Sequence, residues 1–327
     1  MTKIPRHMQA LWLEDHKLEV RHQIPVPAPG LDHALIQVHK AGICSTDLEL
    51  RKGYYSFTGI LGHEFVGTVV AAPGAPERIG ERVVGDINIS CGTCVTCCRG
   101  QPKHCLNRKV LGIRDHHGAL AQYLVLPLTN TLPVPPGMDD DWAVFAEPLA
   151  AALKIQSQVT FAPYDRVLII GAGMLGQLIA RILAPNCQLT VMARHVKQQQ
   201  LLASAGIYWI SEGILKTTKS YDVVIEATGR PQGFTMALTA VRPAGTMVLK
   251  STYHGSARVD LSSIVVNEIQ LIGSRCGSIA QAVKVLSEKS IDPTPLIEFH
   301  YPLKEVLTAF AHAEASGALK ILIEMPV

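Results

Sequence analysis

Residues 166–176 read RVLIIGAGMLG, an apolar run followed by three closely spaced glycines. A buried strand that ends in Gly-x-Gly-x-x-Gly and continues as a helix is typical of a dinucleotide site. We expect Gly171 to make a tight turn, Gly173 to let a pyrophosphate approach the backbone, and Gly176 to allow close helix packing. The positive end of the helix would then face the phosphates.

Strand and helix patterns continue to alternate on the C-terminal side of this turn. Helical crossovers between successive strands favour a parallel sheet. The sequence therefore predicts an α/β fold with a doubly wound sheet of the Rossmann type. The predicted strands are 166–170, 189–192, 207–210, 222–226, 246–250 and 269–272, and the predicted helices are 175–184, 196–205, 232–241 and 279–289.

The region before the glycine turn has a different pattern. Short β-rich runs such as 34–40 and 64–70 alternate with Gly/Pro turns as far as about Val134, which predicts a β-rich, partly barrel-like domain. A helix-forming stretch from about 143 to 159 then leads into the alternating region. Because 327 residues exceed the usual size of one hydrophobic core, we expect two domains.

The composition excludes several function classes. The formal net charge of +3 is spread along the chain and aromatic residues make up only 6%, which disfavours a nucleic-acid partner. No apolar run approaches the roughly 20 residues that span a bilayer, and residues 1–10 lack the apolar stretch of a signal peptide. We therefore expect a cytoplasmic protein with a small-molecule substrate and no membrane partner.

Five of the eight cysteines lie between Cys91 and Cys105. Cys91, Cys94, Cys97 and Cys105 give the spacing C-x2-C-x2-C-x7-C, and four thiolates close a tetrahedral zinc site without an open position. We interpret them as the ligands of a structural zinc in a protruding lobe. Cys98 directly follows Cys97 and is an alternative ligand, although we favour Cys97.

The end of the second predicted strand bears on the choice of cofactor. An NAD site usually has an acid there, about 20 residues after the first glycine, but this chain has Ala193-Arg194-His195. Arg194, helped by Lys197, offers a cation to the 2′-phosphate of NADP, so we predict NADP(H) over NAD(H). The expected cofactor-binding residues are Gly171, Gly173, Met174, Leu175, Gly176, Arg194, His195, Lys197, Thr228, Gly229, Ser274 and Arg275.

Three further motifs are dispersed: GICSTD at 42–47, GHE at 62–64 and FAEP at 145–148. Spacing alone does not make their residues ligands, because a lone Cys or His in an apolar run is commonly a core residue. Together with the cysteine lobe and the glycine turn, however, they resemble the zinc-containing medium-chain dehydrogenase/reductase family along essentially the whole chain. The Glu-Pro pair at 147–148 resembles its polyol, glucose and threonine dehydrogenases more than its ethanol dehydrogenases.

The resemblance implies a second, catalytic zinc. Cys44 and His63 would be permanent ligands, and Glu64 and Glu147 would be the third ligand and an exchangeable or second-sphere partner, in an order that stays open. Thr46 matches the hydroxyl that passes the substrate proton toward solvent. The expected catalytic residues are therefore Thr46, Glu64 and Glu147, and the expected ligands of this zinc are Cys44, His63, Glu64 and Glu147.

The resemblance also implies the domain plan and the activity. A GroES-like catalytic domain would comprise 1–152 plus 295–327, with the Rossmann domain inserted at 153–294. The implied enzyme is a zinc-dependent alcohol dehydrogenase with two zinc ions per chain, acting with NADP(H) on a secondary alcohol, polyol or sugar-like alcohol or ketone, as a homodimer or homotetramer. Glu49 stands where threonine dehydrogenases usually have a histidine, which disfavours threonine.

Two rival hypotheses share the fold. A zinc-independent quinone or enone reductase has the glycine turn but needs neither the cysteine lobe nor Cys44 and His63. A non-catalytic NADPH-binding protein would keep the fold without turnover, since fold does not establish function. Zinc content and turnover distinguish the three hypotheses.

Overall fold

The computed structural model describes residues 4–214 and 219–326, and the remaining residues of the expected domains, 1–3, 215–218 and 327, lie outside the described part. The chain forms two compact units. The first unit runs through Glu147 and also contains Ile279–Ala315 and the chain from Lys320 onward. The second unit consists of Pro148–Ser278 and Ser316–Leu319.

The second unit is built on six parallel strands. They are β11 (Arg166–Ile170), β12 (Gln188–Met192), β13 (Trp209–Ile210), β14 (Tyr221–Glu226), β15 (Val241–Leu249) and β16 (Gln270–Gly273). Their order in the sheet is β13-β12-β11-β14-β15-β16, and every neighbouring pair is parallel. The order runs outward in both directions from β11, which confirms the predicted doubly wound Rossmann sheet.

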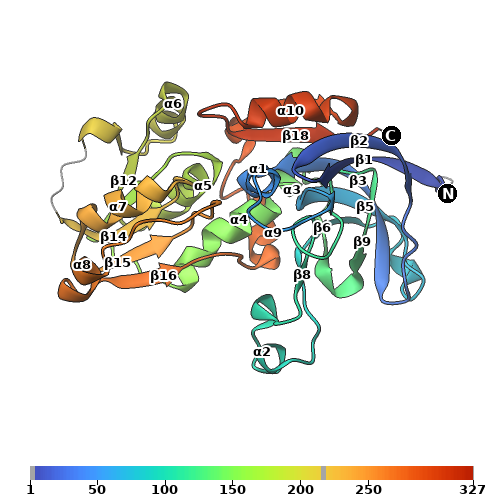
Figure 1. Ribbon diagram of the computed structural model, residues 1–327, viewed down its shortest axis with the longest axis horizontal. Helices are drawn as coiled ribbons and strands as arrows, with labels where there is room; N and C mark the ends of the chain where they lie inside the picture. The colour runs from blue at the N-terminus through green and yellow to red at the C-terminus, as the bar shows by residue number, and fades with distance from the viewer. Residues whose placement is uncertain (1–3, 215–218, 327) are drawn as a thin grey trace. The chain divides into compact units, whose positions relative to one another are not determined.

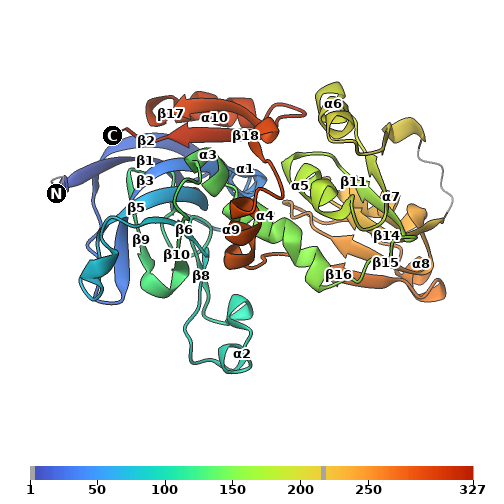
Figure 2. The ribbon, with the colours of Figure 1, turned by 180° about the vertical axis from the view of Figure 1, so that it is seen from behind.

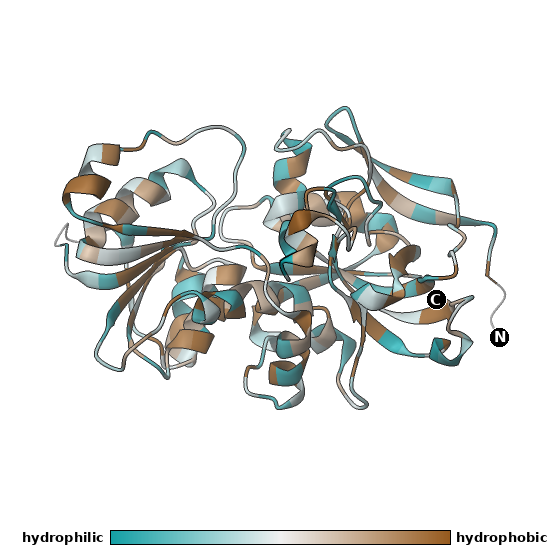
Figure 3. Ribbon diagram, turned by 90° about the horizontal axis from the view of Figure 1, so that it is seen from below, coloured by the Kyte–Doolittle hydropathy of each residue, from teal (hydrophilic) through white to brown (hydrophobic). Residues whose placement is uncertain are grey.

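Helices of the second unit supply the crossovers between these strands. They are α5 (Met174–Leu183), α6 (Val196–Ser204), α7 (Pro231–Ala240) and α8 (Leu261–Val266). The strands are apolar along most of their length (Figure 3), and Val167–Ile170 of β11 is fully buried. A core of this kind holds the carboxyl ends of the strands in fixed positions, and that edge is where the predicted cofactor residues lie.

The first unit is mostly antiparallel sheet. Its strands are β1 (His7–Glu14), β2 (Lys17–Pro25), β3 (His33–Ile43), β4 (Gly59–Ile60), β5 (Glu64–Ala71), β6 (Arg82–Gly85), β7 (Asn88–Ile89), β8 (Lys109–Val110), β9 (Tyr123–Pro127), β10 (Thr131–Pro133), β17 (Ile297–Pro302) and β18 (Lys320–Glu324). Seven of these strands form one sheet in the order β10-β6-β5-β3-β18-β17, with β9 paired to β3. The C-terminal strand β18 therefore completes the same sheet as the N-terminal strand β3 (Figure 2).

The first unit also contains short helices. They are α1 (Ser45–Arg51), α2 (Val95–Cys98), α3 (Asp140–Ala143), α9 (Ile279–Ser287) and α10 (Val306–Ala313), while α4 (Ala146–Leu153) begins in the first unit and continues in the second. The single-turn 3-10 helices are Pro76–Arg78, Pro102–His104, Leu128–Asn130, Lys154–Ser157, Glu212–Ile214, Thr294–Leu296 and Leu303–Glu305. The lobe that carries α2 lies between β7 and β8 in the chain and extends beyond β8 (Figure 1). Within 4–214 and 219–326, no helix is long and apolar enough to cross a membrane.

Helix α9 differs from the expected domain plan. The domain plan expected from the sequence has residues 279–294 in the Rossmann insertion, whereas in the structure they belong to the first unit, where α9 contacts α3. The helix buries Ile279, Ala282 and Leu286 on one face. Such a pattern shows which face is buried but not which unit covers it. The first boundary likewise falls after Glu147, within α4, instead of after residue 152.

Candidate functional site

The first unit brings Cys44, His63 and Glu64 together. One ligand atom from each lies within 4.8 Å of the others. The antiparallel pairing of β3 and β5 places Gly42 opposite Glu64, so the end of one strand meets the start of the next. A Cβ at Gly42 would lie only 2.2 Å from Glu64 Oε2, so this position requires glycine. The pairing of β3 with β5 therefore brings together ligands that are about 20 residues apart in sequence.

Asp47 fixes the orientation of this cluster from within α1. Its side chain is fully buried. Oδ2 accepts a hydrogen bond from the Cys44 N–H at 2.9 Å, and Oδ1 accepts one from the Gly62 N–H at 3.2 Å. Oδ1 also lies 3.3 Å from His63 Nδ1. A carboxylate that orients a histidine in this way is typical of the second sphere of metal sites.

His63 lies in a strongly charged environment. Its burial alone would lower its pKa, but the negative charges of Asp47 and Cys44 outweigh that effect and raise the pKa of His63 well above its usual range. Among the described residues, its buried Nδ1 has no well-formed hydrogen bond. Thr46 lies next to the cluster, with Oγ1 3.8 Å from Cys44 Sγ.

Lys320 is a residue of this site that the sequence analysis missed. It is 1% exposed, and its Nζ donates to the Ile43 carbonyl oxygen at 3.1 Å and pairs with Glu64 Oε2. Burial opposes its charge, but Glu64 foremost, with Cys44, raises the pKa of Lys320. The only signal in the sequence is a lysine at the start of the apolar strand 320–324, which is weak because strands often begin with a solvated charge.

Glu147 lies near the cluster but is not part of the close group. It is partly buried near the start of α4. Desolvation raises the pKa of Glu147, the charge of Glu64 adds to the rise, and His63 and Lys320 oppose it. The structure thus places a carboxylate oxygen of Glu64 within 4.8 Å of the ligand atoms of Cys44 and His63, and Glu147 within electrostatic range of His63, Glu64 and Lys320.

The donor chemistry of this cluster fits a catalytic metal ion. Sulfur, imidazole nitrogen and carboxylate oxygen together are the donors that zinc prefers, and three protein ligands leave a fourth position for a substrate. Among the described residues, Glu64 Oε1 is buried without a hydrogen-bond partner, while Oε2 is occupied by Lys320. Because an unpaired buried carboxylate oxygen is costly, a cation at this position would satisfy it.

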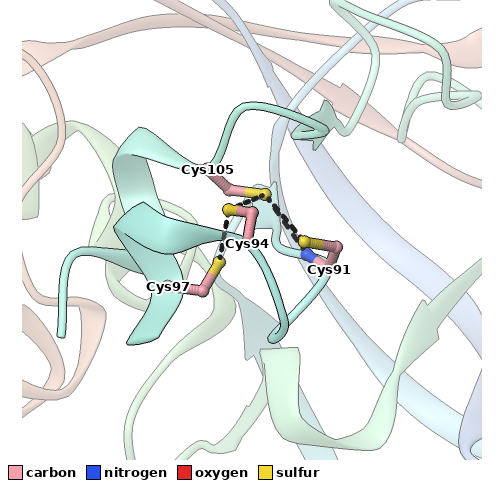
Figure 4. Close-up of side chains that lie close together, drawn as sticks. All are labelled: Cys91, Cys94, Cys97 and Cys105. Carbon is pink, nitrogen blue, oxygen red and sulfur yellow. Dashed lines mark hydrogen bonds between the residues drawn. The ribbon is translucent and has the colours of Figure 1, made fainter. Parts of the chain in front are cut away.

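The cysteine lobe places four sulfur atoms around a common centre (Figure 4). Cys94 Sγ lies 3.4 Å from Cys97 Sγ and 3.7 Å from Cys105 Sγ, which lies 3.5 Å from Cys91 Sγ. Zn–S bonds of about 2.3 Å put the sulfurs of a tetrahedral site about 3.8 Å apart, so the observed distances fit zinc and are too long for disulfides. Cys98 is outside this group, and its thiol donates to the Thr93 carbonyl oxygen at 3.5 Å.

The four thiols differ in acidity. Hydrogen bonds, above all from Thr96, lower the pKa of Cys94 to about 5, and those from Thr93 lower the pKa of Cys91 to about 7. Burial foremost, with neighbouring sulfurs, raises the pKa of Cys97 to about 12. The thiolate form is thus favoured at Cys94 and Cys91, whereas the nearby sulfurs oppose the ionisation of Cys97. A bound divalent cation removes that conflict, because coordinating thiols are deprotonated.

The glycine turn of the second unit has the geometry that the sequence predicts. Gly171 has a φ of +105°, and a Cβ there would lie 2.6 Å from the Ala227 carbonyl oxygen. A Cβ at Gly176 would lie 2.0 Å from the Gly171 carbonyl oxygen, whereas one at Gly173 would meet nothing within 4 Å. The space over Gly173 therefore fits a pyrophosphate at the start of α5, whose first residues are Met174 and Leu175.

The other predicted cofactor residues follow the carboxyl ends of the parallel strands. Thr228 and Gly229 come after β14, and Ser274 and Arg275 come after β16. The buried Lys250, which the sequence analysis missed, donates to Ser274 Oγ at 3.3 Å and to the Arg275 carbonyl oxygen at 3.0 Å. The buried Lys250 thus stabilises the turn after β16 through hydrogen bonds to two of its residues.

Arg194, His195 and Lys197 lie between β12 and the first turn of α6. Arg194 and Lys197 are exposed, and Arg194 Nε donates to His195 Nε2 at 3.3 Å. The position at which an NAD site usually carries an acid is thus occupied by cationic and imidazole side chains.

The comparisons with known proteins agree with these observations. A family model described as "Alcohol dehydrogenase GroES-like domain" matches residues 30–136, and one described as "Glucose dehydrogenase C-terminus" matches residues 141–325. The chain is 27% identical over 331 residues to an L-threonine 3-dehydrogenase of Saccharopolyspora erythraea, covering 93% of this chain and 95% of that protein. It is also 27% identical over 344 residues to D-arabinitol dehydrogenase 1 of Uromyces fabae, covering 98% of each.

Solved structures match along the whole fold. A protein described as a short chain alcohol dehydrogenase from Escherichia coli CFT073, complexed with NADH, has a TM-score of 0.90 and 26% identity, covering 98% of this chain and 100% of that one. A protein from Sinorhizobium meliloti 1021 assigned as a zinc-binding dehydrogenase, bound to NADP, has a TM-score of 0.88 and 26% identity, covering 97% and 99%. Since the two family models cover most of its length, the chain belongs to the zinc-containing medium-chain dehydrogenase/reductase family.

Proposed function

We propose that this chain is a zinc-dependent alcohol dehydrogenase that transfers hydride between NADP(H) and a secondary alcohol, polyol or sugar-like alcohol, or the matching ketone. The observation that carries the proposal is the close cluster of Cys44, His63 and Glu64, in which one buried Glu64 oxygen has no hydrogen-bond partner among the described residues. The D-arabinitol dehydrogenase relative supports the polyol class. Glu49, where threonine dehydrogenases usually have histidine, argues against threonine.

We assign one zinc to each of the two clusters. Cys44, His63 and Glu64 would hold the catalytic ion, with Glu147 as the exchangeable partner, and Cys91, Cys94, Cys97 and Cys105 would hold the structural one. Lys320 keeps Glu64 Oε2 occupied, so Oε1 is the oxygen available as a ligand. Asp47 holds His63 in place while substrates exchange.

The chain's own residues would organise the reaction around these groups. When bound, zinc supplies a Lewis acid that favours the deprotonated alcohol, and the nicotinamide supplies the hydride acceptor. Thr46 Oγ1 lies beside Cys44 and would take the alcohol proton as its own hydroxyl proton moves outward. The carboxyl ends of the parallel strands would orient the cofactor.

Zinc content and turnover test the function together. We expect about two zinc ions per purified chain, NADP(H)-linked turnover with members of a panel of polyols, secondary alcohols and ketones, and tighter binding of NADPH than of NADH. About one zinc ion without turnover would contradict the proposal and favour a non-catalytic NADPH-binding protein. Turnover of quinones or enones by zinc-free protein would favour the zinc-independent reductase.

Thr46 has a separate expected effect. Thr46→Ala should lower kcat about a hundredfold, because a positioned proton-transfer group contributes about 10²–10⁴-fold to a rate. Zinc content and the NADPH dissociation constant should stay as in the wild type, since Thr46 is in neither ligand set. Thr46→Ser is the matched control and should retain most of the rate because it keeps the hydroxyl. An unchanged rate in Thr46→Ala would remove this residue from the mechanism.

We further propose that the chain associates with copies of itself as a homodimer or homotetramer. In the second unit, β16 is an edge strand of the sheet, and Leu271 on it is 41% exposed. Val265 and Val266 of the neighbouring α8 are 74% and 81% exposed. An apolar edge of this kind favours pairing with a second copy. A monomer mass in light scattering would contradict this proposal.

We place this activity in the cytoplasm. All eight cysteines of the chain are free in the structure, including the exposed Cys91 and Cys98. Free thiols arranged for metal binding suit a reducing compartment. Fractionation of the producing cells would locate the protein.

A further inference from the structure

The surroundings of His195 contain two residues that the proposed cofactor site does not yet include. Two segments of the second unit meet there, the turn after β12 and the separate piece Ser316–Leu319, and Arg230, which precedes α7, lies within electrostatic range of the His195 ring. We infer that Arg230 and Ser316 complete, with Arg194, a site for the 2′-phosphate of NADP(H). This inference rests on the proposed NADP(H) function and adds to it the residues that recognise the phosphate.

Hydrogen bonds connect Ser316 to the turn after β12. Ser316 Oγ lies 3.3 Å from His195 Nε2, and Arg194 Nη2 donates to Ser316 Oγ at 3.5 Å. Arg194 Nε also donates to His195 Nε2 at 3.3 Å. The guanidinium of Arg194 is thereby held by two acceptors, and the single proton of the Ser316 hydroxyl, which faces His195 Nε2, would turn to a phosphate oxygen when one binds.

Gly317 allows this approach. Its φ is +88°, and a Cβ there would lie 2.8 Å from the His195 ring. The segment Ser316–Leu319 can therefore reach His195 only with glycine at this position. The close contact brings the hydroxyl of Ser316 to the turn after β12, although the two are 121 residues apart in the chain.

The charges around His195 are positive. Burial foremost, followed by Arg194 and then Arg230, lowers the pKa of His195, so its ring stays neutral and continues to accept from Arg194. Arg230 precedes α7, is exposed, and lies on a different element from Arg194. The positive charges of Arg194 and Arg230 both act on the His195 ring, and a phosphate monoester with a charge of about −1.5 to −2 would offset them. An unmodified ribose, which prefers a carboxylate acceptor, offers no such gain.

Binding titrations test the inference without relying on catalysis. The probes are NADPH, NADH and the adenosine fragments adenosine 2′,5′-bisphosphate and adenosine 5′-monophosphate. Ser316→Ala should weaken NADPH and the bisphosphate about tenfold, because a hydrogen bond to a charged group is lost. Arg230→Gln should weaken both about threefold to tenfold, with a smaller effect at high salt. NADH and the monophosphate should change less than about twofold.

Arg166→Gln is the matched control. Arg166 is an exposed arginine of the same unit, but it begins β11 at the opposite end of the strands from the cofactor edge. The control should leave all four dissociation constants unchanged, and thermal melting should show that each variant is folded. If the wild type prefers NADPH but neither Ser316→Ala nor Arg230→Gln changes its affinity, the inference is wrong and the proposed function stands. If the wild type prefers NADH, both are wrong.

Discussion

His63→Ala should leave the purified chain with about one zinc ion instead of two and lower turnover by at least about a thousandfold. A Lewis-acid metal supplies several kcal/mol of transition-state stabilisation, and each 1.36 kcal/mol corresponds to a factor of ten in rate. His63 is the buried imidazole of the cluster and lies beside Asp47, so its loss removes one of the three close ligands. Elemental analysis and steady-state kinetics measure the two effects.

The control for this variant is His22→Ala. His22 is an exposed histidine on β2 of the same unit, and its loss should change neither zinc content nor kcat. The NADPH dissociation constant of His63→Ala should stay within about twofold of the wild type, because the predicted phosphate-binding residues belong to the second unit. Two zinc ions in His63→Ala, or wild-type turnover with one, would show that this cluster is not the catalytic centre.

Cys94→Ser should remove the other zinc ion. The sulfur of Cys94 lies next to those of Cys97 and Cys105, and the low pKa of Cys94 favours its thiolate form. The substitution therefore removes a thiolate ligand that lies close to two of the other three sulfurs. Apparent binding free energies of structural zinc in small peptides are about 10–16 kcal/mol, which far exceeds what so short a lobe gains from its own packing. We expect the segment 91–105 to become sensitive to proteases, and turnover to fall as the lobe unfolds.

Cys98→Ser is the matched control for the lobe. Cys98 is the neighbour of Cys97 in sequence, but its thiol lies outside the cluster and donates a hydrogen bond to the Thr93 carbonyl oxygen. Cys98→Ser should therefore keep two zinc ions per chain and the protease resistance of the wild type, whereas Cys97→Ser should behave like Cys94→Ser. The reverse pattern would assign Cys98 as the ligand and contradict the arrangement in Figure 4.

The sequence predicted those parts of the molecule that local chemistry determines. The strand 166–170 was predicted with the bounds of β11, because four consecutive apolar residues before a glycine turn fit a fully buried parallel strand. The four-cysteine spacing likewise confines its sulfurs to one short lobe. By contrast, Cys44, His63 and Glu64 were grouped only through the family resemblance, since strand pairing across the chain brings them together.

The residues that were missed act through contacts distant in sequence. Lys320 reaches Glu64 across 256 positions, and Ser316 reaches His195 across 121. No sequence motif beside either residue indicates its role. A lone lysine is common at the start of a strand, and a lone serine is common in a loop. Helix α8 was missed for a related reason: its apolar residues are largely exposed, so its sequence lacks the pattern of a buried face.

The short piece Ser316–Leu319 has a practical consequence for chimeric enzymes. It belongs to the second unit although the chain on both sides of it belongs to the first. A transplanted cofactor domain made only of residues 148–278 would therefore leave behind the serine and glycine that contact His195. An exchange of nucleotide preference between two dehydrogenases of this design must graft two fragments, the large one and this four-residue loop.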